Sequence, residues 1–112
     1  MVAAGLLGHI YYWGQGVAID YPRAFAAYKV GAEGGDADCQ YQLGFMYYDG
    51  EGVPQDFKQA RAWYEKAAAQ DQPNALYNLG YKYAAGHGVP QDFKQARVWF
   101  CLLYTSDAAD DA

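Results

Sequence analysis

The residue types that most often perform chemistry are scarce in this chain, and their spacing keeps them apart. The two histidines, His9 and His87, lie far from each other, and the two cysteines are Cys39 and Cys101. A metal ion needs several ligands at close spacing, and these four residues form no such cluster. Cys39 falls where the other units of the repeat described below have alanine, so we interpret it as a buried, inert thiol. We expect no catalytic, cofactor or metal site.

Hydroxyl nucleophiles are also nearly absent. The only threonine and serine are Thr105 and Ser106, so an enzyme that attacks through a serine has nowhere to place one. Gly-x-Gly pairs begin at Gly14, Gly50 and Gly86. No Lys-Ser or Lys-Thr follows them, so we interpret them as helix ends and not as phosphate loops. The chain is therefore not expected to be an enzyme.

Composition narrows the class of protein further. Of the 112 residues, 53% are hydrophobic and 19% are charged, which favours a buried core over disorder. The net charge of −5 argues against a nucleic-acid partner, because phosphates attract basic surfaces.

No apolar run is long enough for a membrane span. The first thirteen residues are apolar, but no basic stretch precedes them, so we predict no signal peptide and leave the compartment open.

An internal repeat determines which elements position the remaining candidates. The Gly-x-Gly-Val motif recurs at an offset of 36 residues, and the same offset relates the Leu-Gly pairs that begin at Leu7, Leu43 and Leu79. It also relates Asp20 to Asp56 and Asp92. A fixed period of this length is typical of solenoid proteins.

Each unit is predicted to be two antiparallel helices. In the second unit the first helix runs from Asp38 to Asp49, and Gly50 ends it with a positive φ. Asp56 caps the second helix, and Pro73 lies in the first turn of the next. Small residues at the Gly44 position of each unit let the paired helices approach closely. We predict an all-α, right-handed α-solenoid with units at about residues 1–37, 38–73 and 74–100.

The motif Leu-Gly-x-x-Tyr-x-x-Gly-x-Gly-Val, followed by Asp, Lys-x-Ala and Trp-Tyr-x-Lys-Ala-Ala, resembles the Sel-one-like repeat (SLR) family. This family is a tetratricopeptide-like α-solenoid with a longer loop between its helices. The second unit matches best, the third matches as far as Phe100, and the first is looser. The resemblance implies an adaptor that holds partner proteins together, often in bacterial signalling or protein quality control.

Residues 101–112 depart from the repeat. The segment from Cys101 to Ala112 resembles a translated sequencing adapter, and we interpret it as a non-native tail on a fragment. The alternative is a genuine last half-helix followed by an acidic tail.

The resemblance places the partner-binding surface on the concave face, which the first helices line. A side-chain spacing of three and four residues keeps one strip of each helix together, and tyrosine combines apolar area with a hydroxyl. The predicted contact residues are His9, Tyr12, Trp13, Asp38, Tyr41, Phe45, Tyr48, Asp49, Asn74, Tyr77 and Tyr81. The alternative for each aromatic residue is packing between adjacent helices.

Two further hypotheses accompany the adaptor. One is that the repeats are a regulatory or substrate-docking arm of a larger enzyme whose catalytic domain is absent here, and the other is that the chain is a small hydrolase. The expected partner is a protein or peptide, and exposed apolar ends predict a tendency to self-associate. The basic residues of the second helices are expected to form a solvated outer face, namely Lys58, Arg61, Lys94 and Arg97.

Overall fold

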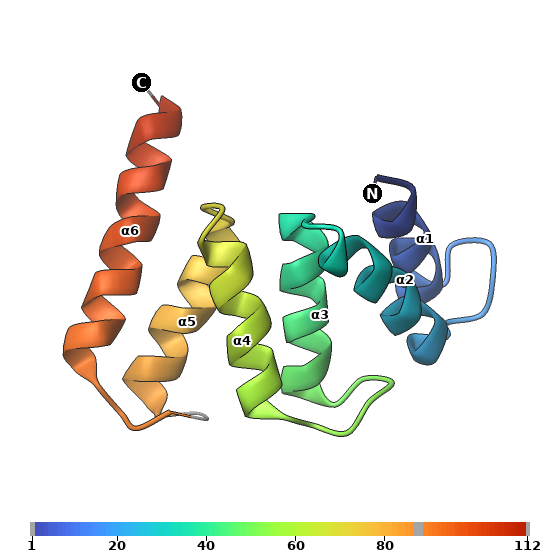
Figure 1. Cartoon of the computed structure of the whole chain (residues 1–112), viewed down its shortest axis with the longest axis horizontal. Helices are drawn as coiled ribbons and strands as arrows, with labels where there is room; N and C mark the ends of the chain where they lie inside the picture. The colour runs from blue at the N-terminus through green and yellow to red at the C-terminus, as the bar shows by residue number, and fades with distance from the viewer. Residues whose placement is uncertain (1, 87–88, 112) are drawn as a thin grey trace.

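The computed structural model describes the backbone of residues 2–86 and 89–111, and the side chains of residues 4–86 and 89–104. Within these ranges the chain forms six helices and no strand. They stand side by side, and the chain runs from α1 at one end of the row to α6 at the other (Figure 1). The helices are α1 (Val2–Trp13), α2 (Tyr21–Glu33), α3 (Ala37–Asp49), α4 (Phe57–Ala68), α5 (Pro73–Ala85) and α6 (Phe93–Asp111).

Recurring local signals set the ends of these helices. The Asp56 carboxylate accepts hydrogen bonds from the backbone N–H groups of Lys58 and Gln59 at 3.0 and 3.1 Å, as the cap prediction requires. Asp92 makes the same pair of bonds one unit later. Gly50 ends α3 in the left-handed region with φ of 72°, which an L side chain adopts with strain.

The paired helices approach closely where the sequence places a glycine. A Cβ atom on Gly44 would lie 2.9 Å from the Tyr64 ring and 3.1 Å from the Ala60 carbonyl oxygen. Gly8 faces Tyr28 and Gly80 faces Phe100 in the same way. The predicted close packing of the two helices in each unit is confirmed.

The two buried clusters extend across the boundaries between units. One cluster joins α2 to α3 and includes Tyr12 of α1, and a second joins α4 to α5. The second helix of each of the first two units therefore covers the first helix of the next. This arrangement confirms the predicted all-α solenoid with its repeat of helix pairs. The second cluster contains Ala60, Tyr64, Ala67, Ala68, Ala75, Leu76 and Leu79.

The segment interpreted as a non-native tail lies partly outside the described residues. The backbone stays helical through Asp111, as the last turns of α6, whereas the side chains from Thr105 onward are not described. That interpretation stays a prediction.

Candidate partner-binding surface

The predicted contact residues of the first helices divide into an exposed group and a packed group. Trp13 is 62% exposed, and Tyr77 and Tyr81 are 54% and 47% exposed. Tyr77 and Tyr81 are four residues apart on α5, so they lie on the same side of that helix. Asp38, Asp49 and Asn74 are also exposed.

Three predicted residues of α3 are partly buried because they pack against the second core cluster. The Tyr41 ring centroid is 5.7 Å from that of Tyr64 and 6.2 Å from that of Phe45. The Tyr48 and Phe57 ring centroids are 5.1 Å apart. Burial raises the pKa of the Tyr41 hydroxyl. Each of these residues offers only part of its surface to a partner.

Tyr12 lies in the core. It is 8% exposed, and its hydroxyl donates to both carboxylate oxygens of Glu51, at 3.0 and 3.2 Å. Burial first, and the Glu51 carboxylate second, raise the pKa of Tyr12 above its ordinary value. The hydrogen bond joins the first unit to the loop of the second. Tyr12 therefore has little surface left for a partner in this arrangement.

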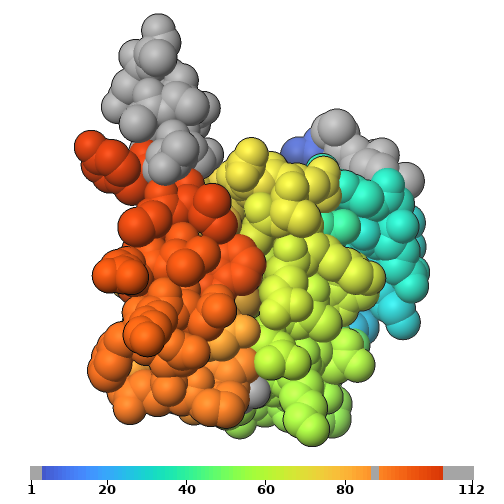
Figure 2. Space-filling view, turned by 60° about the vertical axis from the view of Figure 1, so that its left-hand side comes forward, coloured from blue at the N-terminus to red at the C-terminus, as the bar shows by residue number. Residues whose placement is uncertain are grey.

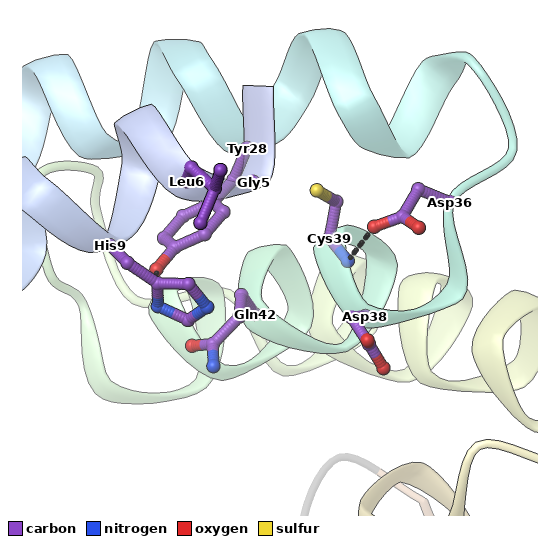
Figure 3. Close-up of a pocket in the computed structure, with 8 residues that line it drawn as sticks. All are labelled: Gly5, Leu6, His9, Tyr28, Asp36, Asp38, Cys39 and Gln42. Carbon is purple, nitrogen blue, oxygen red and sulfur yellow. Dashed lines mark hydrogen bonds between the residues drawn. The ribbon is translucent and has the colours of Figure 1, made fainter. Parts of the chain in front are cut away.

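His9 and Asp38 line one pocket, of about 180 Å³, between α1 and α3. Figure 3 shows the Tyr28 hydroxyl pointing toward the His9 ring, with the Gln42 amide beside it. The His9 Nδ1 atom and the Tyr28 hydroxyl oxygen are 2.8 Å apart. Gln72 Nε2 donates to Asp38 Oδ1 at 3.3 Å, so Asp38 also links two units. The pocket has room for a small side chain or for solvent.

Lys82 is a buried residue that the sequence analysis overlooked. It is 1% exposed, and its Nζ atom lies 3.5 Å from the Tyr48 ring centroid, with the rings of Phe57 and Tyr64 also nearby. No hydrogen-bond partner for this amine is found among the described residues. The repeat could have predicted the burial of Lys82, because the 36-residue offset relates this residue to Ile10 and Met46, which are apolar.

Of the residues considered for chemistry, Cys39 is part of the packed core, Cys101 is exposed on α6, and His87 lies outside the described residues. Cys39 is buried against the first core cluster, and burial raises the pKa of its thiol to about 12, so the reactive thiolate is disfavoured. In the part of the chain that the structure describes, no three His, Cys, Asp or Glu residues come together as a metal site would require.

None of the described helices combines the length and apolar character needed to cross a bilayer.

Helix pairs that stack in register, each completing the core of its neighbour, define an α-solenoid of the tetratricopeptide-like class. The chain belongs to the Sel1 repeat family, because the sequence model of the Sel1 repeat matches residues 2–36, 37–72 and 73–105. Proteins of this family are generally protein–protein interaction modules, and the fold is typically a non-catalytic scaffold.

Two solved structures agree with this assignment. A Sel1 repeat protein from Oxalobacter formigenes is 35% identical over 94% of this chain, with a TM-score of 0.90. A protective antigen of uropathogenic Escherichia coli strains, which displays an SLR fold, is 35% identical over 93% of this chain, also with a TM-score of 0.90. The chain spans 43% and 22% of the lengths of these two proteins. A search of curated proteins found no match.

Proposed function

We propose that this chain is an adaptor module that binds an extended peptide or a partner helix across the first helices of its units. The observation that carries the proposal is the exposure of Tyr77 and Tyr81, at 54% and 47%, on one side of α5. Rigid aromatic side chains on an ordered helix give a partner a large contact area at a low entropic cost. Trp13, Asn74, Asp38 and Asp49 extend the proposed surface along the row of helices.

The partly buried residues have a smaller role in the proposal. Tyr41, Phe45 and Tyr48 support the surface from beneath, because their rings pack on the α4 side while one part of each remains accessible. His9 contributes through the pocket it shares with Asp38. Tyr12 is left out of the contact set because its surface is already occupied by the core and by Glu51.

Charge and exposed ends define the class of partner. Nucleic acid is not among the proposed partners, since a net charge of −5 repels phosphates. A second copy of the chain is among them, because large apolar side chains lie exposed at both ends of the solenoid. These are Leu6 and Leu7 on α1, and Phe93, Val98, Leu102 and Tyr104 on α6.

The substrate-docking arm of a larger enzyme is a second candidate function. The observation that favours it is the limited share of the solved neighbours that this chain spans. Both candidates use the same exposed surface.

A displayed library of random peptides tests the proposed surface. We expect the wild-type chain to enrich peptides, and the double variant Tyr77→Ala/Tyr81→Ala to bind them at least tenfold more weakly, about 1.4 kcal/mol. The matched control is Ile19→Ala/Val30→Ala. This variant also removes two exposed apolar side chains, 59% and 58% exposed, but both lie outside the proposed surface. Circular dichroism establishes that both variants stay folded.

Two outcomes would overturn the proposal. One is a library that yields no peptide for the wild-type chain. The other is a folded Tyr77→Ala/Tyr81→Ala variant that binds the selected peptides as tightly as the control does.

A further inference from the structure

A cavity of about 520 Å³ opens at the C-terminal end of the solenoid. Figure 2 brings this end forward, where α5 and α6 form the outer surface in orange and red. The lining is largely apolar, with Ala84 from α5 and Phe93, Ala96, Arg97, Phe100 and Tyr104 from α6.

One unit earlier, the equivalent surface is covered. The 36-residue offset relates the lining residues to Tyr48, Phe57, Ala60, Arg61, Tyr64 and Ala68. There the next first helix, α5, lies on top, and the Lys82 side chain extends over the rings of Tyr48, Phe57 and Tyr64. The cavity therefore has the shape that a following first helix would fill.

The exposed fractions of equivalent side chains on α4 and α6 show which part of the α6 surface is uncovered. Tyr64 is fully buried, whereas its equivalent Phe100 is 36% exposed. Ala68 is 5% exposed, whereas its equivalent Tyr104 is 76% exposed. The surface of α6 thus retains the apolar character of a unit-to-unit interface without a helix to cover it among the described residues.

Helix α1 offers the complementary surface at the opposite end. Leu43 and Leu79 are fully buried, but Leu7 at the same repeat position is 46% exposed, because no described helix precedes α1. Ile10 stands at the position that Lys82 occupies in α5. An isoleucine fits an apolar cavity better than a lysine does, since no charge is removed from water.

We propose that the cavity at the α5–α6 end takes helix α1 of a second copy of this chain, so that the solenoid continues from one molecule into the next. In this arrangement Leu7 packs where Leu79 packs on α4, and Ile10 lies over Phe93 and Phe100. The contact joins two different surfaces and does not close on itself, so copies add head to tail. This inference rests on the self-association part of the proposed function. The 36-residue offset relates Tyr77 and Tyr81 to Tyr41 and Phe45, which are partly buried, so the α1 helix of the second copy would partly cover these two tyrosines.

Two variants that each damage one end test the arrangement. In sedimentation velocity over a series of concentrations, the average mass of the wild-type chain should rise with concentration. Leu7→Glu and Phe93→Glu should each stay monomeric, because each lacks one of the two complementary surfaces. An equimolar mixture should form a one-to-one dimer and nothing larger, since Leu7→Glu keeps its cavity and Phe93→Glu keeps its α1. Tyr104→Glu should replace Phe93→Glu in the mixture with the same result.

Three results would overturn the proposal. A wild-type chain that stays monomeric throughout the series excludes it, and so does a mixture of folded variants that stays monomeric. Leu7→Glu that still dimerises alone would mean that two C-terminal ends pair with each other. If assembly fails while Tyr77→Ala/Tyr81→Ala still weakens peptide binding, the adaptor function stands without this interface.

Discussion

At the scale of single residues, Lys82 is the clearest conflict between a side chain and its surroundings. Its amine is surrounded by aromatic rings and lies 3.5 Å from the Tyr48 ring centroid, an arrangement that stabilises a cation in part. Burial nevertheless lowers the pKa of Lys82 to about 8, while the Asp49 carboxylate acts in the opposite direction. The folded chain therefore holds this proton less tightly than the unfolded chain does.

Replacing this lysine should stabilise the protein. We expect Lys82→Met, which copies Met46 of the preceding unit, to raise the free energy of unfolding by about 1–3 kcal/mol at pH 7. The gain is complete below pH 8 and shrinks as the pH rises toward the ordinary lysine pKa, because the folded wild-type chain then carries a neutral amine. Urea unfolding at pH 7.5 and pH 9.5 measures both effects.

Buried tyrosines also affect stability in the upper part of this pH range. Burial raises the pKa of Tyr28 and Tyr64, so these residues begin to destabilise the fold as the pH approaches the ordinary tyrosine pKa. The buried Cys39 thiol and the buried tyrosines lower the stability of both proteins alike as the pH rises, so the difference in stability between Lys82→Met and the wild-type chain tests the lysine. That difference should shrink between the two measured pH values. An unchanged difference would show that Lys82 does not titrate in this range.

At the scale of helices, the glycine in the Leu-Gly pair decides how closely two helices pack. Gly44 faces the Tyr64 ring and the Ala60 carbonyl oxygen at distances that a Cβ atom cannot keep unless the buried ring or the α4 backbone moves. Gly5, also within a helix, faces only the Cys39 Sγ atom, at an ordinary 3.4 Å. Alanine favours the helix over glycine by about 1 kcal/mol at either position. The surroundings of each glycine therefore determine whether its replacement by alanine stabilises or destabilises the fold.

The two glycines form a matched pair of substitutions. We expect Gly44→Ala to destabilise the fold by about 1–3 kcal/mol through overpacking, and Gly5→Ala to be neutral or stabilising. Thermal unfolding followed by circular dichroism compares them directly. A Gly44→Ala variant that melts at or above the wild-type temperature would show that α3 and α4 can separate without loss.

At the scale of the whole molecule, stability should vary along the solenoid. α3 packs on α2 and α4, and α4 packs on α3 and α5, whereas α1 packs mainly on α2 and α6 mainly on α5. In a solenoid each unit is stabilised by its immediate neighbours, so the ends hold fewer stabilising interfaces than the centre.

Amide hydrogen exchange tests this gradient. At a concentration where the chain is monomeric, we expect amides of α3 and α4 to exchange at least about tenfold more slowly than those of α1 and α6. Equal protection in all six helices would mean that the chain opens only as one cooperative unit.

The sequence alone was sufficient for the helix pairs, their caps and the family. Gly50, Asp56 and Pro73 each act within one or two turns of the chain. The first two also recur at the 36-residue offset, as Gly14 and Gly86 and as Asp20 and Asp92. The family model and the packed helices confirm what those residues predict.

Only the tertiary structure decided which residues of the predicted strip reach the surface. Tyr41 is partly buried and Tyr77, at the same repeat position, is 54% exposed, because α5 packs beyond α3 and α4 but no described first helix packs beyond α5 and α6. The same reason explains why Lys82 is enclosed and why Phe93 and Tyr104 are uncovered. Equivalent positions in a repeat share their backbone conformation, but their burial depends on the helix that packs against them, and that helix comes from another part of the chain.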